Sequence, residues 1–248
     1  MRIIVTEQYE ESCLVAANLI AEAVRANPAA KLGLATGGTP LPIYRHLIEM
    51  HRQGQLDFSQ VRTVNLDEYC GLGGSHPQSY RYFMDTNLFN HININKANTF
   101  VPNGLGEPGE SAAELDKMVY EGGVPAVQLL GVGNNGHIAF NEAGSHLTAA
   151  SHIETLTEST LQANARFFEK EADVPTHAIT MGLEGILASR CPLLVATGAA
   201  KAEAMRGLLL GSEVTTQNPS TFLKLHPGSV VVVDKALAAL AGYPAPQA

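Results

Sequence analysis

The sequence predicts an α/β fold: a single-domain, doubly wound (Rossmann-like), mainly parallel β-sheet with helices on both faces. Short apolar runs rich in β-branched residues alternate along the chain with segments whose apolar residues recur at helical spacing. The chain is 45% hydrophobic but poor in aromatics, so Ala, Val, Leu and Ile must form the core, as in a sheet covered on both faces. No Gly/Ser linker, charge block or internal repeat divides residues 1–248, which favours one domain.

The N-terminal half is expected to begin as strand, helix, strand. Arg2–Val5 is a short β-branched run, and Glu10–Ala26 carries apolar residues at helical spacing until Asn27-Pro28 ends it. Pro40 suits the first turn of a helix, because its fixed φ and missing N–H cost nothing there. The remaining elements expected in this half are strands Lys31–Ala35 and Val61–Leu66 and helices Leu41–Arg52, Pro77–Phe89 and Ser111–Tyr120.

The C-terminal half repeats this alternation, apart from one long polar segment. Leu147–Asp173 is polar on one face and shows no clear strand. Insertions of this kind between strands often cover a site, so a lid is expected there. The apolar runs expected as further buried strands are Val124–Leu130, Ala178–Met181, Leu193–Ala196 and Val230–Val233, and helices are expected at Leu183–Ser189, Ala199–Leu210 and Lys235–Ala241.

Charge and cysteine content restrict the classes of partner. A formal charge of −8 argues against nucleic acid and against an anionic membrane surface. Cys13, Cys70 and Cys191 show no metal-binding spacing, which indicates reduced thiols in a cytoplasmic protein, and the histidines lack HxxxH or HExxH spacing, so no metal is expected. Met1–Thr6 has no signal-peptide layout, and no apolar run approaches the roughly 20 residues of a membrane helix.

The most informative motif is the glycine-rich turn Leu130–Gly144, which follows a predicted strand and carries Asn135, His137, Asn141 and Glu142. Glycine lets a backbone approach a ligand closely or adopt a positive φ. A histidine in such a turn, with a carboxylate five residues later, is typical of an acid–base site. A plain strand-to-helix turn with a polar tip is the alternative, and the polar side chains gathered around one turn make it the weaker interpretation.

A second glycine turn, Thr36-Gly37-Gly38-Thr39, precedes a predicted helix. Free N–H groups and the helix dipole favour an anion at such a place, usually phosphate. The turn lacks the ending of a P-loop, and a structural capping turn explains it about as well; the two threonine hydroxyls favour phosphate.

Asp67 and Glu68 follow the predicted strand Val61–Leu66. Neighbouring strand residues face opposite sides, so the two carboxylates are not expected to form one dyad. One of them could be a base while the other orients a neighbour. On the residues alone, a solvated pair or a helix N-cap fits somewhat better.

Arg166 and Lys201 are candidate cations for a phosphate. Lys201 lies at a predicted helix start, where it opposes the helix dipole, and a bound phosphate would compensate; an isolated exposed lysine is the default interpretation. Arg166 in the expected lid could grip the same phosphate in bidentate fashion. Because the carboxyl ends of parallel strands share one edge of a sheet, these motifs are expected to meet there.

Several of these strings resemble the glucosamine-6-phosphate deaminase family over almost the whole chain. The specific ones are Asn65-Leu-Asp-Glu-Tyr69 and the His-Ile-Ala-Phe-Asn-Glu string at 137–142, supported by Gly33–Pro40, Asn164–Phe168 and Leu225-His226-Pro227. The resemblance implies isomerisation and deamination of glucosamine 6-phosphate to fructose 6-phosphate and ammonia. It implies a small phosphosugar as the ligand, and neither a metal nor an organic cofactor.

The resemblance also implies roles for individual residues. Asp67 would move the proton between C2 and C1 of the open-chain sugar, and His137 would open the ring, oriented by Glu142 and by Asn135. The chemistry suits the residue types, because a carboxylate can relay a proton through an enolamine and histidine exchanges protons near neutral pH. The residues that would hold the 6-phosphate are Thr36, Gly37, Gly38, Thr39, Arg166 and Lys201.

Two departures from the family pattern concern protonation and regulation. Many members have Asp where this chain has Asn135; an aspartate would stabilise an imidazolium on His137, whereas a neutral amide only fixes the tautomer. The hexameric members are activated by N-acetylglucosamine 6-phosphate through basic residues at a position where this chain reads Ser151-His-Ile-Glu154. No such activation is expected here. The protein is expected to be a monomer or a small homo-oligomer.

Two other functions stay open from the sequence. A 6-phosphogluconolactonase-like hydrolase would share the fold and a similar Gly-x-Gly-x-x-Gly-His turn, but lactonases resemble Thr-Ala-Ser-Leu-Phe-Pro where this chain has Ile138–Glu142. A non-catalytic sugar-phosphate sensor would usually be fused to a DNA-binding helix-turn-helix. No such segment is expected before Arg2–Val5, and the set of candidate catalytic residues is whole.

Overall fold

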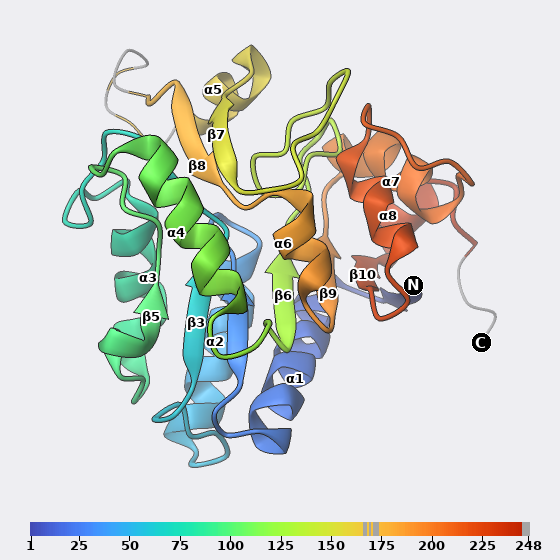
Figure 1. Ribbon diagram of the computed structural model, residues 1–248. Helices are drawn as coiled ribbons and strands as arrows, with labels where there is room; N and C mark the ends of the chain where they lie inside the picture. The colour runs from blue at the N-terminus through green and yellow to red at the C-terminus, as the bar shows by residue number, and fades with distance from the viewer. Residues whose placement is uncertain (166–167, 169, 171–173, 245–248) are drawn as a thin grey trace.

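A parallel sheet runs through the centre of the computed structural model, which describes residues 1–165, 168, 170 and 174–244 (Figure 1). The strand order is β1-β10-β9-β6-β2-β3-β5, and every pairing between neighbours is parallel. This arrangement confirms the predicted fold class. The strands are β1 (Arg2–Thr6), β2 (Lys31–Leu34), β3 (Arg62–Asn65), β5 (Thr99–Phe100), β6 (Val127–Leu130), β9 (Pro192–Ala196) and β10 (Val230–Asp234).

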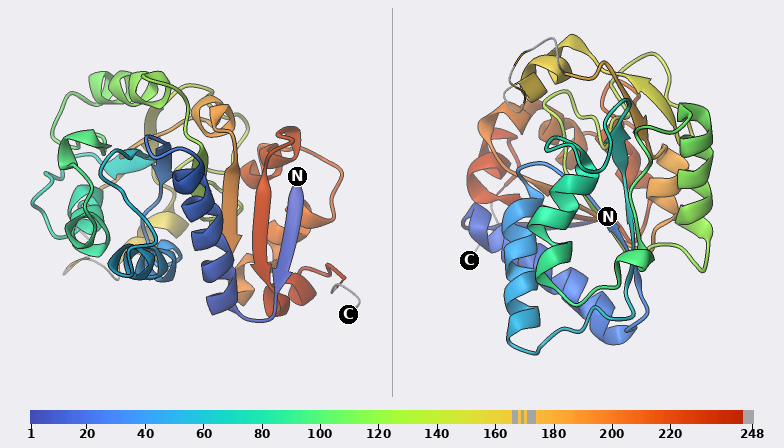
Figure 2. Two further views of the ribbon diagram at one scale, coloured as in Figure 1. Left: turned by 90° about the horizontal axis from the view of Figure 1, so that it is seen from below. Right: turned by 90° about the vertical axis from the view of Figure 1, so that its left-hand side faces the viewer.

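Helices cover both faces of this sheet. The views in Figures 1 and 2 place α4 and α6 on one face and α1 and α2 on the other. The main helices are α1 (Tyr9–Ala26), α2 (Pro40–Arg52), α3 (Tyr80–Asn87), α4 (Pro108–Tyr120), α6 (Leu183–Ala188), α7 (Ala202–Leu209) and α8 (Lys235–Leu240). Short 3₁₀ turns lie at Phe89–His91, Lys96–Asn98, Ala199–Lys201 and Pro219–Leu225.

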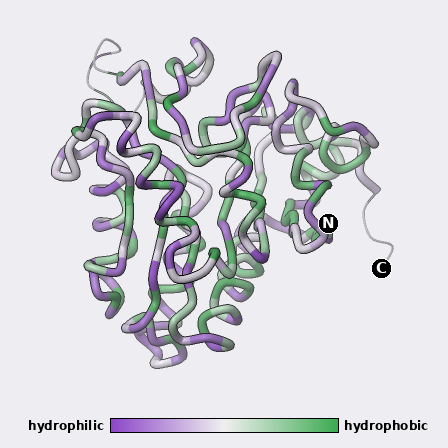
Figure 3. Tube along the Cα trace, in the orientation of Figure 1, coloured by the Kyte–Doolittle hydropathy of each residue, from purple (hydrophilic) through white to green (hydrophobic). Residues whose placement is uncertain are grey.

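The central strands are buried along their whole length. Every residue of β6, β9 and β10 is buried, which explains why these strands read as continuous apolar runs and not as alternating ones. Figure 3 shows the same pattern, with hydrophobic colour along the central strands and polar colour on outer loops and helix surfaces. The core is therefore aliphatic, as the composition predicts.

A second, antiparallel sheet lies beyond the carboxyl ends of the parallel strands (Figure 1). Its strand order is β4-β8-β7. Its strands are β4 (Asp67–Tyr69), β7 (His152–Thr155) and β8 (His177–Thr180). The helix α5 (Glu158–Ala165) follows β7 along the chain.

This small sheet corrects two of the sequence predictions. The run Ala178–Met181 was expected in the parallel sheet, but β8 pairs antiparallel with β4 and β7. The expectation of no strand in Leu147–Asp173 is also wrong, because β7 lies there. Its residues are partly buried or exposed, so it has no apolar run from which a strand could be recognised.

Candidate active site

Four neighbouring strands bring the predicted motifs to one edge of the sheet. The order β9-β6-β2-β3 is continuous and parallel, so the loops that follow these strands leave from the same edge. Lys201 follows β9, the His137 turn follows β6, Thr36–Thr39 follows β2, and Asp67 follows β3. The structure thus gathers all of these predicted site residues, and the edge lies at a reversal of chain order, where open α/β sheets bind ligands.

The turn after β6 holds a histidine against a carboxylate. Nδ1 of His137 lies 3.1 Å from Oε2 of Glu142, and because an ionised carboxylate can only accept, Nδ1 carries the hydrogen. The His137 side chain is 22% exposed and that of Glu142 is 5% exposed. Among the described residues no hydrogen bond reaches Nε2, which can therefore exchange a proton with a ligand while the buried carboxylate fixes the ring.

Asn135 acts on Glu142 and not on the imidazole. Its Nδ2 donates to Glu142 Oε2 over 2.8 Å, and its Oδ1 accepts from the backbone N–H of His137 over 3.2 Å. The amide thus holds the carboxylate and the turn at the same time. An aspartate at this position would bring two carboxylates together, which the sequence alone did not reveal.

Both oxygens of the Glu142 carboxylate have donors. Thr160, from α5, donates its hydroxyl to Oε1 over 2.5 Å, while His137 and Asn135 donate to Oε2. Burial alone would raise the pKa of Glu142, but the bonds from His137, Thr160 and Asn135 outweigh it and lower the pKa to about 2. Thr160 was missed from the sequence, because the contact joins residues 18 positions apart and no local pattern marks it.

Two glycines shape this turn. A Cβ on Gly133 would lie 2.4 Å from Cε1 of His137, so the ring can occupy its place only because position 133 has no side chain. Gly136 has φ +87° and packs against Asn218, where a Cβ would lie 2.1 Å from Oδ1. Asn141 is fully buried and donates to the carbonyls of Ile138 and Met181, so it fastens the turn instead of facing a ligand.

Asp67 lies on β4 with its side chain almost fully buried. Burial and then the neighbouring charge of Glu68 raise its pKa to about 8. Within the described part of the chain, no hydrogen bond reaches its carboxylate. A buried carboxylate of this kind is a much stronger base than an exposed one.

Glu68 has a different environment, as its strand position predicts. Its carboxylate accepts from the backbone N–H groups of Tyr69, Tyr80 and Arg81 over 2.9, 2.9 and 3.0 Å. Burial raises the pKa of Glu68 to about 7, although these three bonds oppose the shift. Glu68 therefore anchors the N-terminus of α3 beside Asp67 and does not form a dyad with it.

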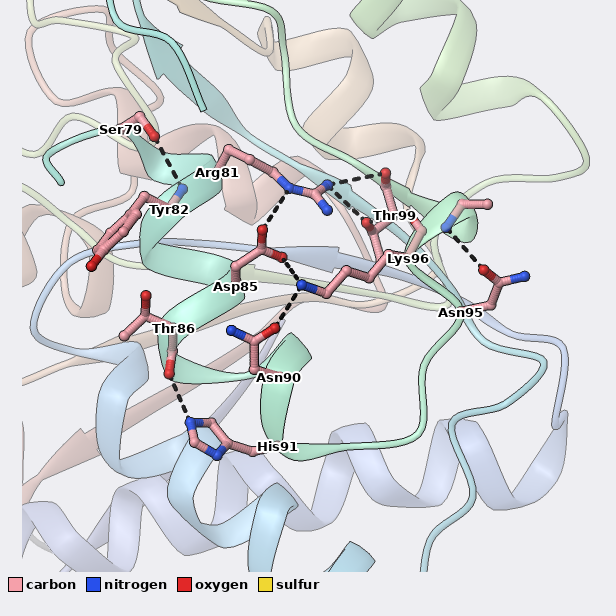
Figure 4. A network of polar contacts seen from close by, with 11 residues as sticks. Ser79, Arg81, Tyr82, Asp85, Thr86, Asn90, His91, Asn95, Lys96 and Thr99 are labelled. Atoms are coloured by element: carbon pink, nitrogen blue, oxygen red, sulfur yellow. Dashed lines mark hydrogen bonds and ion pairs between the residues drawn. The ribbon is translucent and has the colours of Figure 1, made fainter. Parts of the chain in front are cut away.

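Figure 4 shows how α3 is held in turn. Ser79 caps the helix by accepting from the Tyr82 backbone N–H over 3.0 Å. Arg81 reaches Asp85 over 3.3 Å and the Thr99 hydroxyl over 2.9 Å, and Lys96 pairs with Asp85 over 3.2 Å. These contacts tie α3 to the chain around β5 and so fix the helix end that binds Glu68.

The Thr36–Thr39 turn is open on its outer side. Gly37 has φ +98°, and a Cβ on Gly37 or Gly38 would have no neighbour within 4 Å. Thr39 is the N-cap of α2 and makes no side-chain capping bond, so its hydroxyl is available to an anion. The first turn of α2 offers no free N–H, because Pro40 and Pro42 have none and Leu41 donates to the Gly38 carbonyl. Tyr44 pins the loop, exchanging hydrogen bonds with the backbone N–H and carbonyl of Ala35 over 3.2 and 2.5 Å.

Of the two candidate cations, Lys201 lies within the described residues. Nζ of Lys201 donates to the carbonyl oxygen of Val132, in the turn that carries His137. Burial lowers the pKa of Lys201, so an anion beside it would restore the charge that burial disfavours. Arg166 lies outside the described residues.

A cavity of about 710 Å³ adjoins the turn on the side of α7. Asn134, Asn135 and Ala143 line it together with Glu203, Glu213 and Gln217. Asp67 and the Thr36–Thr39 turn do not, so this cavity lies beside the candidate site and is not the space between its reactive groups. In the described part of the chain, no cluster of His, Cys, Asp or Glu could hold a metal, and no helix is long and apolar enough to cross a membrane.

Comparisons with known proteins agree with this geometry. The family described as glucosamine-6-phosphate isomerases/6-phosphogluconolactonase matches residues 6–232. The chain is 52% identical to a glucosamine-6-phosphate deaminase of Clostridium perfringens strain 13, over 97% of this chain and 99% of that protein. It is 46% identical to one of Thermoanaerobacter pseudethanolicus, over 97% of this chain and 95% of that protein.

Solved structures give the same relation. A monomeric glucosamine-6-phosphate deaminase is 41% identical and superimposes with a TM-score of 0.93, covering 97% of this chain and all of that one. The 6-phosphogluconolactonase of Trypanosoma cruzi is 20% identical with a TM-score of 0.72, covering 96% of each chain. This second likeness extends to the fold alone.

Proposed function

The chain belongs to the family of glucosamine-6-phosphate isomerases and 6-phosphogluconolactonases, and from that premise we propose that it converts glucosamine 6-phosphate and water to fructose 6-phosphate and ammonia. One observation carries the proposal: a histidine fixed by a buried carboxylate and a strongly basic Asp67 follow separate strands that end at one edge of the sheet. The His137–Glu142 pair and Asp67 can each transfer protons, which suits a reaction with two consecutive proton-transfer steps. Identity of 52% to a named deaminase, against 20% to a lactonase, favours the deaminase.

Ring opening is the first step. With Nδ1–H bound to Glu142, Nε2 of His137 can take the proton of the C1 hydroxyl and pass it to the ring oxygen. The C1–O5 bond breaks and the open-chain aldehyde forms. Glu142, held by Asn135, contributes by fixing the tautomer, since in the other tautomer Nε2 would carry the hydrogen and could not accept the proton of the C1 hydroxyl.

Isomerisation and deamination follow. Asp67 removes the C2 proton as the C1 oxygen gains one, which gives an enolamine. It then returns the proton to C1 as the amino group loses one, which leaves an imine at C2. Water adds to the imine, and the resulting carbinolamine loses ammonia, so one water is consumed for each ammonia released. The burial that raises the pKa of Asp67 to about 8 makes its carboxylate a stronger base for the first of these transfers than an exposed aspartate would be.

Phosphate binding supplies the orientation. Thr36, Thr39 and the backbone of Gly37 and Gly38 offer hydroxyl and amide donors, and Lys201 offers a cation. Arg166 completes the grip in this proposal. Binding energy from the phosphate would position C1 and C2 over Asp67.

The segment Leu147–Asp173 acts as the lid, and the protein works as a monomer without activation by N-acetylglucosamine 6-phosphate. In support, α5 contacts Glu142, and the named relative of 41% identity is a monomeric deaminase. Within the segment, Ser151–Glu154 carry no lysine or arginine to bind an effector phosphate.

Ammonia release from glucosamine 6-phosphate tests the function. The wild type should release ammonia and Asp67→Asn should lose at least about a thousandfold in kcat, with binding of the sugar phosphate retained, because only the proton transfer is removed. Equal rates would refute the role of Asp67. Hydrolysis of 6-phosphogluconolactone without ammonia release would support the lactonase, and binding without turnover the sensor.

A further inference from the structure

Glu142 is held by a hydroxyl from outside its own turn. Thr160 is 6% exposed and donates to Oε1 over 2.5 Å, whereas His137 and Asn135 both use Oε2. The two oxygens of the carboxylate are thus divided between the turn and α5. Removing the donor on Oε1 would leave a buried oxygen without a partner and let the carboxylate rotate away from the imidazole.

The Thr160 hydroxyl is itself positioned within α5. Thr157 donates its hydroxyl to Thr160 Oγ1 over 3.1 Å and accepts from the Thr160 backbone N–H over 3.4 Å. Leu161, the next residue, packs against the cluster of Tyr69 and Phe140. This packing seats the helix so that the threonine faces the carboxylate, and the hydrogen bond exists only while α5 is seated.

We propose that Thr160 is a positioning residue that couples α5 to the His137–Glu142 pair: when α5 is seated, its hydroxyl orients Glu142 so that the carboxylate fixes the imidazole for ring opening. The inference rests on the proposed function for its kinetic consequence, but the coupling itself is a property of the hydrogen bond. By reciprocity, Glu142 must stabilise the seated α5 as much as Thr160 stabilises the carboxylate.

Kinetics of matched variants test the positioning role. Thr160→Val keeps the shape and removes the hydroxyl, so kcat for ammonia release should fall roughly five- to twentyfold with KM nearly unchanged. Thr160→Ser should restore most of the rate. Thr155→Val makes the same substitution at an exposed position of β7 and should leave the rate unchanged. A Thr160→Val rate equal to wild type, or a serine variant as slow as the valine variant, overturns the proposal.

A double-mutant cycle separates a specific coupling from a general structural effect. In a Glu142→Gln background the Thr160→Val substitution should cost less than about twofold, because the charged carboxylate that Thr160 orients against the imidazole has already been removed. An equal loss in both backgrounds would mean that Thr160 acts elsewhere. Thermal unfolding of each variant confirms that the proteins compared are folded.

Hydrogen exchange tests the coupling without any turnover. Glu142→Gln and Thr160→Val should each speed amide exchange in α5 severalfold, and Thr155→Val should not. Unchanged exchange in both variants refutes the coupling. If the wild type released no ammonia, the proposed function would fail while this exchange result still decided whether Thr160 and Glu142 are coupled.

Discussion

At the scale of single residues, the site shifts the pKa values of two carboxylates in opposite directions. Burial and the charge of Glu68 raise the pKa of Asp67 to about 8, and no donor reaches its carboxylate among the described residues. The pKa of Glu142, which is equally buried, is lowered to about 2 by hydrogen bonds from His137, Thr160 and Asn135. Opposite shifts within one site separate a proton-accepting group from a permanently charged one. This separation follows from hydrogen-bond partners and not from residue type.

The raised pKa of Asp67 predicts that Asp67→Asn stabilises the protein at alkaline pH. The folded-state pKa lies above the usual value of about 4, so the stability linked to this group is fully present below pH 4 and is lost as pH rises through 8. Asparagine has no charge to bury. The free energy of unfolding from urea titrations should be higher than wild type by roughly 1–3 kcal/mol at pH 9 and nearly equal at pH 4.5.

Glu142→Gln should change the free energy of unfolding in the opposite direction from Asp67→Asn. The lowered pKa of Glu142 means that its stabilisation is present above about pH 4.5 and is lost as pH falls through 2. The glutamine variant should therefore be less stable than wild type at pH 7. A stabilised Glu142→Gln, or an Asp67→Asn with no pH dependence relative to wild type, would contradict the assigned environments.

Gly133→Ala should inactivate the enzyme while Gly131→Ala does not. A Cβ at Gly133 would lie 2.4 Å from the His137 ring and must displace it, whereas a Cβ at Gly131 meets nothing within 4 Å. Ammonia release should fall at least about a hundredfold in the first variant, because a shift of about 1 Å in a catalytic group has that effect. Similar rates for the two alanine variants would show that the ring does not need that space.

At the scale of elements, α3 links the catalytic strand to its surroundings. Its N-terminal amides hold Glu68, the neighbour of Asp67, and Ser79 caps the same helix end from a fully buried position. Loss of the Ser79 cap should therefore loosen the amides that bind Glu68 and so disturb the position of Asp67.

Ser79→Ala tests this link against Ser75→Ala, which alters an exposed serine in the preceding loop. Loss of the cap should cost about 1 kcal/mol in the free energy of unfolding and lower kcat several-fold, since the helix end frays where it binds Glu68. Ser75→Ala should change neither quantity. If urea titration shows the two variants to be equally stable, the cap does not hold α3.

The elements also show what a sequence can and cannot predict. The strands of the parallel sheet were predictable, because burial on both faces leaves continuous apolar runs such as β10. The strand β7 was not, because it is partly exposed and its partner β8 is distant in sequence. At the site, glycines and polar strand ends marked Asp67 and His137. The Thr160 contact depends on how α5 seats against the turn, which no local pattern encodes.

At the scale of the whole molecule, strand order creates the site. Residues from Thr36 to Lys201 meet because β9, β6, β2 and β3 are neighbours although they are not consecutive in the chain. Every group that the proposed reaction needs, apart from the undescribed Arg166, therefore comes from one chain. The catalytic cycle as proposed has no step that requires a second subunit.

The protein is accordingly predicted to be a monomer with hyperbolic kinetics. Sedimentation equilibrium should give a mass near 26.3 kDa, the mass of one chain. A monomer has one active site, so saturation by glucosamine 6-phosphate should show a Hill coefficient of about 1, and N-acetylglucosamine 6-phosphate should not activate it. Adding that compound below saturating substrate is the sharper measurement, because a cooperative oligomer would respond most strongly there. A sigmoidal curve that the compound makes hyperbolic, together with a mass several times that of the chain, would contradict both parts of the prediction.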